Sequence, residues 1–151
     1  HCNGSVDLLN YLKMQQQLGG NHAKPPFVMG VISNFDPRLY TLLSNMKIAH
    51  YFEFILNSYD CNVEKPNGKF FELAMKQSEL ANLKPSECLH IGDGPTTDYL
   101  AAKSMGWNAA LIHEKNYPYL LQKYGERIEE HLVFPSLYDF HKKLSNHFIA
   151  W

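Results

Sequence analysis

The residues best suited to do chemistry lie in the stretch 88–98, which reads C-L-H-I-G-D-G-P-T-T-D. Apolar residues lead into Gly92, a Gly-Pro pair then breaks the strand, and Thr-Thr-Asp supplies residues that begin helices. The pattern predicts a short buried strand that delivers Asp93 and Asp98 into the turn and first helical positions after it. Ligands sit at the carboxyl ends of strands in α/β sheets, so these two acids could hold a divalent cation. The alternative is a solvated loop in which Asp98 merely complements the helix dipole.

Two other positions carry polar groups where apolar strands do not need them. Ser33 and Asn34 follow the continuous apolar run 27–32. Lys65 precedes Pro66, which biases it away from helical geometry, so its amine can point off the end of the sheet. Taken singly, the Ser-Asn pair could be a turn former and the lysine a surface residue. Together with two carboxylates, a hydroxyl and an amine are the parts needed to bind a phosphate beside Mg²⁺.

The elements that must position these residues alternate between strands and helices. Apolar runs predict strands at 27–32, 52–56, 88–92 and 108–112, and a short one at 132–133. Helical spacing and capping residues predict helices at 5–18, 38–46, 67–80, 96–105, 117–124 and 136–147, with a polar loop after residue 56. The alternation, with connections long enough for right-handed crossovers, predicts a three-layer doubly wound α/β fold with a mostly parallel sheet.

Composition bounds the function classes. The chain has 151 residues, which is one domain's worth. A net charge of -1 gives no basic field for nucleic acid and no polybasic patch for a membrane. The longest apolar runs are strand-sized, so none is expected to span a bilayer. The three cysteines are scattered and lack C-x-x-C spacing, which favours a reducing, cytoplasmic compartment over disulfides or a zinc site. No protein partner can be inferred.

The order of these motifs matches that of a known superfamily. V-I-S-N-F-D at 31–36, E-K-P at 64–66 and H-I-G-D-G-P-T-T-D at 90–98 resemble motifs II, III and IV of the haloacid dehalogenase-like (HAD-like) hydrolases. The flanking segments V-I-S-N-F-D-P-R-L and D-Y-L-A-A-K-S-M-G-W look like the animal branch usually named HAD-like hydrolase domain-containing proteins. The resemblance runs continuously over residues 5–112. The remaining C-terminal portion is compatible with it but adds little.

The resemblance implies a role for each candidate residue. Ser33 would be the phosphate-binding hydroxyl, helped by the backbone of Asn34. Lys65 would stabilise the nucleophile and the phosphoryl charge. Asp93 would bind Mg²⁺ directly, and Asp98 would complete and orient that metal site. Members are typically Mg²⁺-dependent phosphatases of small phosphorylated metabolites that pass through an aspartyl-phosphate.

The match departs from the family at motif I. That motif is an Asp-x-Asp at the end of the first, central strand, and no Asp-x-Asp occurs in this sequence. We therefore expect residues 1–151 to be a partial HAD-like core, without the first strand and the cap, from a longer or processed chain that begins here at His1. Asp36 is the carboxylate nearest to Ser33 in sequence, but it begins a helix and is a poor substitute for the nucleophile. The chain alone is expected to be inactive.

In the family's sheet the missing strand lies between the strand that ends at Ser33 and the one that precedes Asp93. Two apolar strand edges would then lack a partner, which predicts poor stability or aggregation of this chain by itself. A non-catalytic HAD-fold binding or regulatory protein is the main alternative. A Rossmann-type nucleotide binder rests only on Gly92-x-Gly94 and lacks the third glycine and the ribose-binding acid. Response-regulator-like receivers explain the Ser-Asn and Lys-Pro pairs less well.

Overall fold

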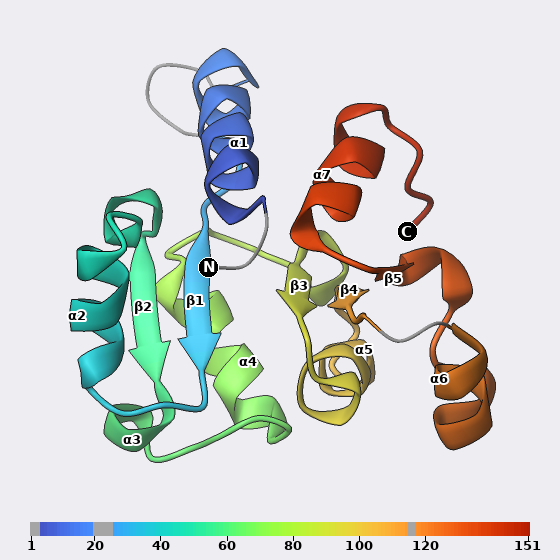
Figure 1. Cartoon of the computed structure of the whole chain (residues 1–151). Helices are drawn as coiled ribbons and strands as arrows, with labels where there is room; N and C mark the ends of the chain where they lie inside the picture. Colours follow the sequence, from blue (N-terminus) through green and yellow to red (C-terminus); the bar gives the residue numbers. More distant parts are fainter. Residues whose placement is uncertain (1–3, 20–25, 115–116) are drawn as a thin grey trace. The chain divides into compact units, whose positions relative to one another are not determined.

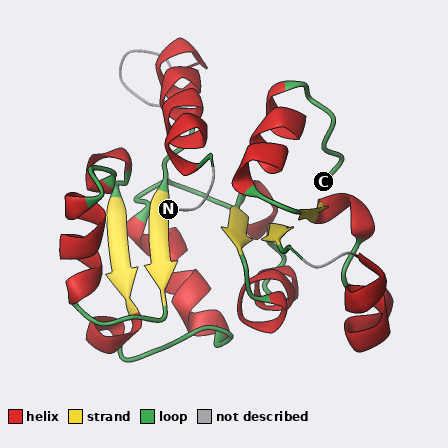
Figure 2. Cartoon of the chain, in the orientation of Figure 1, coloured by secondary structure: helices red, strands yellow, loops and turns green. Residues whose placement is uncertain are grey.

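A computed structural model describes residues 4–19, 26–114 and 117–151 (Figure 1). The described residues form two compact units. The N-terminal unit runs from Val6 to Asn82, and the C-terminal unit comprises Leu83–Trp151 together with Gly4 and Ser5. Helices and short strands alternate along both units (Figure 2). Each unit is described by itself below.

The N-terminal unit is built on two parallel strands, β1 (Gly30–Ser33) and β2 (Phe54–Asn57). Their register pairs Gly30 with Phe54 and Ser33 with Asn57, so both strands end at the same edge. The helices of this unit are α1 (Ser5–Gly19), α2 (Arg38–Asn45), α3 (Ser58–Cys61) and α4 (Gly68–Gln77), with a 3-10 turn at Ala49–Tyr51. Helix α2 packs against β2 and α4 against β1 (Figure 1).

Helix α4 contributes much of the core of this unit. Phe70 and Phe71 are fully buried and Ala74 nearly so, as the apolar spacing of the segment predicts. Ile32 of β1 and Leu39 of α2 are also buried. Ser33, the last residue of β1, therefore directly follows a strand residue that is packed in this core.

The C-terminal unit contains a three-stranded parallel sheet in the order β3-β4-β5. Its strands are β3 (Leu89–Gly92), β4 (Asn108–Ile112) and β5 (Val133–Phe134). Its helices are α5 (Ala101–Ser104), α6 (Tyr117–Tyr124) and α7 (Leu137–Ser145), with 3-10 turns at Pro85–Glu87, Gly125–Arg127 and Glu130–Leu132 and a π-helix at Pro95–Leu100. Tyr99, Leu111, Leu120 and Phe140 are fully buried between these elements.

Two predicted segments were wrong in detail. The polar loop expected after residue 56 contains α3, which begins where the Oδ1 atom of Asn57 accepts a hydrogen bond from the Asp60 N–H at 2.7 Å. The helix expected at 96–105 opens as a π-helix, because the N–H groups of Asp98 and Tyr99 both donate to the Gly94 carbonyl at 3.0 Å. A π-helical turn is rare overall and is frequent at functional sites.

The fold class is confirmed as α/β and Rossmann-like, with every strand pair parallel. The boundaries moved by a few residues: the first strand pairs from Gly30 rather than from residue 27, and the last lies at Val133–Phe134. Within the described part of the chain, no helix combines the length and the apolar character needed to cross a bilayer.

Candidate functional site

The first group of candidate residues lies at the carboxyl end of β1. Ser33 is the last residue of the strand and Asn34 follows it. The side-chain amide of Asn34 bonds to the backbone of Lys65 at two points: its Oδ1 accepts from the Lys65 N–H at 2.8 Å, and its Nδ2 donates to the Lys65 carbonyl at 2.9 Å. The structure therefore brings Asn34 and Lys65 together across 31 residues of sequence.

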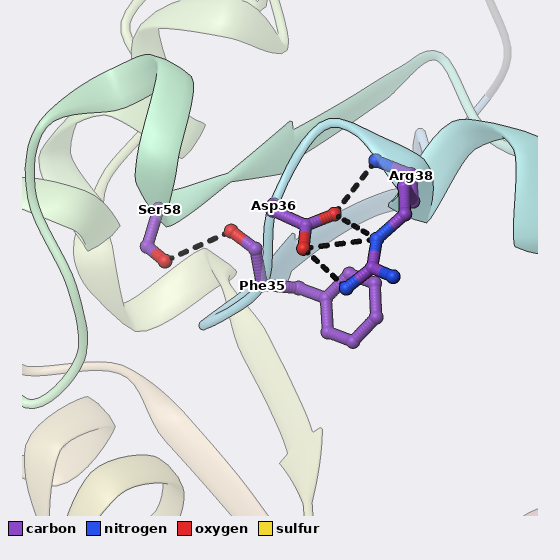
Figure 3. Close-up of polar contacts among 4 residues, drawn as sticks. All are labelled: Phe35, Asp36, Arg38 and Ser58. Carbon is purple, nitrogen blue, oxygen red and sulfur yellow. Dashed lines mark hydrogen bonds and ion pairs between the residues drawn. The ribbon is translucent and has the colours of Figure 1, made fainter.

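The same loop is held from the other side by α3. The Phe35 carbonyl accepts from the Ser58 hydroxyl at 3.1 Å and from the Tyr59 N–H at 3.2 Å. Figure 3 shows the first of these bonds. Because the segment after Ser33 is tied both to α3 and to Lys65, the end of β1 is a fixed platform rather than an open turn.

Asp36 is bound by Arg38, as Figure 3 shows. Its carboxylate accepts bonds from the Arg38 guanidinium at 2.7 to 3.0 Å and from the Arg38 N–H at 2.9 Å. The side-chain and backbone hydrogen bonds from Arg38 lower the pKa of Asp36. Asp36 lies two residues before α2, and its ionised carboxylate is paired with the Arg38 guanidinium at 2.7 Å.

An open cavity of about 920 Å³ adjoins this platform. It is lined by Asn34, Phe35, Asp36, Ser58, Tyr59, Asn62, Val63 and Glu64. The cavity lies wholly in the N-terminal unit, at the end where β1 and β2 both stop. Carboxyl ends of parallel strands are where α/β folds bind ligands.

The second group of candidate residues follows β3 in the C-terminal unit. Asp93 is exposed and comes directly after the strand. Asp98 is 4% exposed and lies in the π-helix. One of its oxygens, Oδ2, accepts from the Gly94 N–H at 2.9 Å, and the other, Oδ1, lies 2.8 Å from His90 Nε2. The two carboxylates therefore differ: Asp93 is open to a ligand, whereas Asp98 is clamped within the unit.

Glycine leaves room for a side chain of this turn at two positions, for Asp98 next to Gly92 and for Thr97 next to Gly94. A Cβ at Gly92 would lie 2.3 Å from Asp98 Cγ, and a Cβ at Gly94 would lie 2.2 Å from Thr97 Oγ1. Both distances are far shorter than van der Waals contact. The G-D-G sequence is thus what allows the turn to fold back over the end of β3.

These two carboxylates could bind Mg²⁺ together with waters and a phosphate, but they could not enclose the ion by themselves. Among the described residues there is no group of three or more His, Cys, Asp or Glu side chains that could hold a metal ion. Mg²⁺ is commonly bound through one or two carboxylates, with waters and substrate phosphate completing its octahedron. Asp93 beside a clamped Asp98 fits that mode, in which the protein alone does not enclose the ion.

The five candidate residues are divided between the two units, and two of their contacts were not predicted from the sequence. Ser33, Asn34 and Lys65 lie in the N-terminal unit, and Asp93 and Asp98 lie in the C-terminal unit. The sequence assigned Asn34 a backbone role, and its side-chain clamp on Lys65 was not anticipated. His90 was not singled out either, although its place two residues before Gly92 in a strand that ends at the site was an available signal.

Parallel strands that end in polar residues, alternating with helices, define an α/β protein with candidate ligand-binding residues at its strand ends. Comparison with known proteins identifies the family. A family model described as haloacid dehalogenase-like hydrolase matches residues 1–106, and the chain belongs to this family. It is 57% identical over 150 residues to the rhythmically expressed gene 2 protein of Drosophila melanogaster, covering 99% of this chain and 55% of that protein. It is 37% identical over 105 residues to haloacid dehalogenase-like hydrolase domain-containing protein 3 of Xenopus laevis, covering 70% of this chain and 41% of that one.

The chain spans about half the length of the curated relatives that it matches. Among solved structures, a HAD phosphatase from Thermococcus onnurineus superposes with a TM-score of 0.70 at 20% identity, covering 94% of this chain and 57% of that one. The HAD-hydrolase YfnB from Bacillus subtilis, described as bound to magnesium, also gives 0.70, at 18% identity, covering 95% and 55%. At these identities the likeness concerns the fold.

Proposed function

We propose that the complete protein is a Mg²⁺-dependent phosphatase that acts on a small phosphorylated metabolite. The observation that carries the proposal is the platform at the end of β1, where Ser33 ends the strand and Asn34 holds Lys65. A serine hydroxyl at the strand end and a lysine whose backbone is bonded to the next residue suit a phosphate group, and the chain belongs to a hydrolase family. The neighbouring cavity offers room for the rest of the substrate.

Each residue has a separate task in this proposal. The Ser33 hydroxyl and the backbone N–H of Asn34 donate hydrogen bonds to phosphate oxygens. The Lys65 ammonium offsets the negative charge that develops in the transition state. Asp93 binds Mg²⁺, with Asp98 completing and orienting the metal site, and the bound ion supplies further charge neutralisation.

The nucleophile of this proposal lies outside the given sequence. By the family resemblance it is the first carboxylate of an Asp-x-Asp, which forms a bond to phosphorus as the ester P–O bond breaks and the leaving oxygen is protonated. Water then hydrolyses the acyl phosphate and releases inorganic phosphate. The 151-residue chain has no Asp-x-Asp, so we propose that it is inactive by itself.

The test is phosphate release by the full-length protein from a panel of phosphate monoesters, with Mg²⁺ and after chelation with EDTA. We expect Mg²⁺-dependent release, and a loss of about 10²-fold or more in kcat for Lys65→Met, since it removes a charge that acts in the transition state. Lys76→Met is the matched control, because Lys76 is an exposed lysine at the other end of α4. A full-length protein that releases no phosphate from any ester with Mg²⁺ present would overturn the proposal.

The second candidate is a non-catalytic HAD-fold binding or regulatory protein. It is favoured by one observation, the absence of Asp-x-Asp from this sequence. The intact mass of the endogenous protein, with the sequence of its N-terminal peptide, separates the two. A mass well above 17.4 kDa with Asp-x-Asp upstream supports the enzyme, and a mass that matches these residues alone supports the binding protein.

We also propose a cytoplasmic location. Cys61 and Cys88 are free thiols, which suits a reducing compartment, whereas Cys2 lies outside the described residues. Burial raises the pKa of both described thiols, so they stay protonated and poorly nucleophilic at neutral pH. Fractionation of cells that express the full-length protein with a C-terminal tag would test the location.

A further inference from the structure

One buried polar contact in the C-terminal unit joins Asp98 to His90, a residue that has no role in the proposed function. His90 Nε2 lies 2.8 Å from Asp98 Oδ1, and only 12% and 6% of the two side chains are exposed. His90 comes from β3 and Asp98 from the π-helix, so the contact joins the strand to the turn that leaves it. Burying a polar pair is costly unless it is well bonded. The pair is linked to the segment that carries the exposed Asp93, because the next residue, Gly94, donates its N–H to Asp98 Oδ2 at 2.9 Å.

The chemistry of the contact fixes its direction. An ionised carboxylate can only accept, so His90 donates from Nε2–H to Asp98 Oδ1. The Gly94 N–H donates to the other oxygen at 2.9 Å. Two donors on different oxygens set the plane of the carboxylate as well as its position. The His90 ring is itself oriented edge-on to Trp107, at 6.5 Å between centroids and 74° between planes.

We infer that His90 is a positioning residue for the metal site: it holds the Asp98 carboxylate in the orientation that Mg²⁺ binding at Asp93 requires. The inference rests on the proposed function, because it assigns His90 a task at the proposed Mg²⁺ site. Groups behind the ligands of a metal commonly fix ligand orientation, and their loss typically costs about 10–100-fold in metal affinity or activity. A purely structural pair would instead contribute to folding and leave metal affinity unchanged.

Two amide substitutions in the full-length protein separate these roles. In His90→Gln the side-chain nitrogen can occupy the place of Nε2 and donate to Asp98. In His90→Asn the amide is one methylene shorter and cannot reach Oδ1. Both are neutral, polar and smaller than histidine, so each controls for the general cost of replacing a buried imidazole. Phe140→Leu serves as a destabilised control, since Phe140 is fully buried in the same unit and lies in α7.

The primary measurement is the Kd for Mg²⁺ by isothermal titration calorimetry, with the thermal midpoint recorded for each variant. We expect His90→Asn to raise the Kd about tenfold or more and His90→Gln to stay within about threefold of the parent protein. Phe140→Leu should lower the thermal midpoint and leave the Kd unchanged. A second readout is the Mg²⁺ concentration that half-activates phosphate release, which should follow the Kd.

The outcomes distinguish this inference from the proposed function. Equal Kd values for the Asn and Gln variants, or a Kd shift of the same size in Phe140→Leu, would overturn the positioning role even in an active phosphatase. A parent protein that binds Mg²⁺ but hydrolyses no phosphate ester would refute the proposed function, while the calorimetric comparison would still decide the role of His90. If the parent protein binds no Mg²⁺, the inference is overturned.

Discussion

In the turn after β3, some positions cannot hold a larger side chain without a clash. Gly92 is one, because a Cβ there would lie 2.3 Å from Asp98 Cγ and 2.5 Å from Asp98 Oδ2. We predict that Gly92→Ala lowers the free energy of unfolding by about 1–3 kcal/mol, as overpacking of a close contact does. It should also weaken Mg²⁺ binding, since the displaced group is the Asp98 carboxylate. Urea denaturation and calorimetry check the two effects.

Gly19 provides the control for that substitution. It is the last residue of α1, and a Cβ there would meet its nearest neighbour, Pro26 Cγ, at 3.4 Å. Gly19→Ala should therefore change the free energy of unfolding by no more than about 1 kcal/mol, in the stabilising direction. Equal losses of stability in the two alanine variants would show that the contact with Asp98 is not what makes Gly92 necessary.

Asn34 is the second residue with a defined structural task. Asn34→Ala removes both bonds to the Lys65 backbone, and because these bonds are exposed we expect a loss of stability of only about 1 kcal/mol. If Lys65 acts on phosphate as proposed, phosphate release by the full-length protein should fall by about tenfold, since small displacements of a positioned group are costly. Gln77→Ala, on the exposed part of α4, is the control for both measurements. An unchanged kcat in Asn34→Ala would show that the hydrogen bonds from Asn34 are not needed to position Lys65.

At the scale of residues, the sequence predicts positions along the chain better than contacts between side chains. The positions of Ser33 at the end of β1 and of Asp93 and Asp98 after β3 could be predicted, because strands end at recognisable glycine and polar residues. The bond between Asn34 and Lys65 could not, because it joins residues 31 apart whose meeting depends on the pairing of β1 with β2 and on the path of the following loop. The contact between His90 and Asp98 depends on the π-helical turn, which no apolar periodicity encodes.

At the scale of elements, Tyr99 links the π-helix to the segment that follows α6. It is fully buried, and its hydroxyl accepts a hydrogen bond from the Glu129 N–H at 3.2 Å. Burial raises the pKa of Tyr99 above its ordinary 10.0, because the charged phenolate is poorly solvated there. The folded protein therefore favours the neutral form of Tyr99. The contribution of Tyr99 to stability is fully present below the pKa that it has in the unfolded chain, and it is lost as the pH rises through its higher pKa in the folded protein.

We predict that the free energy of unfolding decreases as the pH rises above about 10, and that this decrease is smaller in Tyr99→Phe, which cannot ionise. Tyr99→Phe should also be somewhat less stable at neutral pH, because the Glu129 N–H loses its partner. Urea denaturation across this pH range is the measurement. Tyr40→Phe is the matched control, since Tyr40 is 63% exposed and should keep the parent slope. If the free energy of unfolding of Tyr99→Phe decreases with pH as steeply as that of the parent protein, groups other than Tyr99 cause the loss of stability at alkaline pH.

The elements themselves were largely predictable, and the exceptions have physical reasons. Helices α1, α4, α6 and α7 follow apolar spacing and cap residues, as with Ser136, whose hydroxyl accepts from the Asp139 N–H at 3.2 Å. Helix α3 is four residues long, too short for a periodic signal to appear. The π-helix arises because Gly94 offers one carbonyl to two successive N–H groups, a choice made by local geometry.

At the scale of the whole molecule, alternation of strands and helices was enough to predict an α/β fold, but it could not predict how the strands divide into sheets. The described strands form one two-stranded and one three-stranded sheet. β1 pairs with β2, and β3 pairs with β4. Among the described strands, β1 and β3 each have no partner on their other edge. Pairing of this kind depends on long-range contacts that local sequence patterns do not specify.

Those two edges determine how the 151 residues should behave when expressed alone. Val31 and Ile32 in β1 and Ile91 in β3 place apolar side chains along strands whose outer N–H and C=O groups can template pairing with another molecule. We predict that this chain by itself is poorly stable and aggregates, whereas the full-length protein stays monodisperse under the same conditions. Size-exclusion chromatography with light scattering and a thermal melt provide the comparison. A soluble monomer of the chain with a cooperative thermal transition would contradict the prediction, and would mean that the two edges are protected by their own twist and side chains.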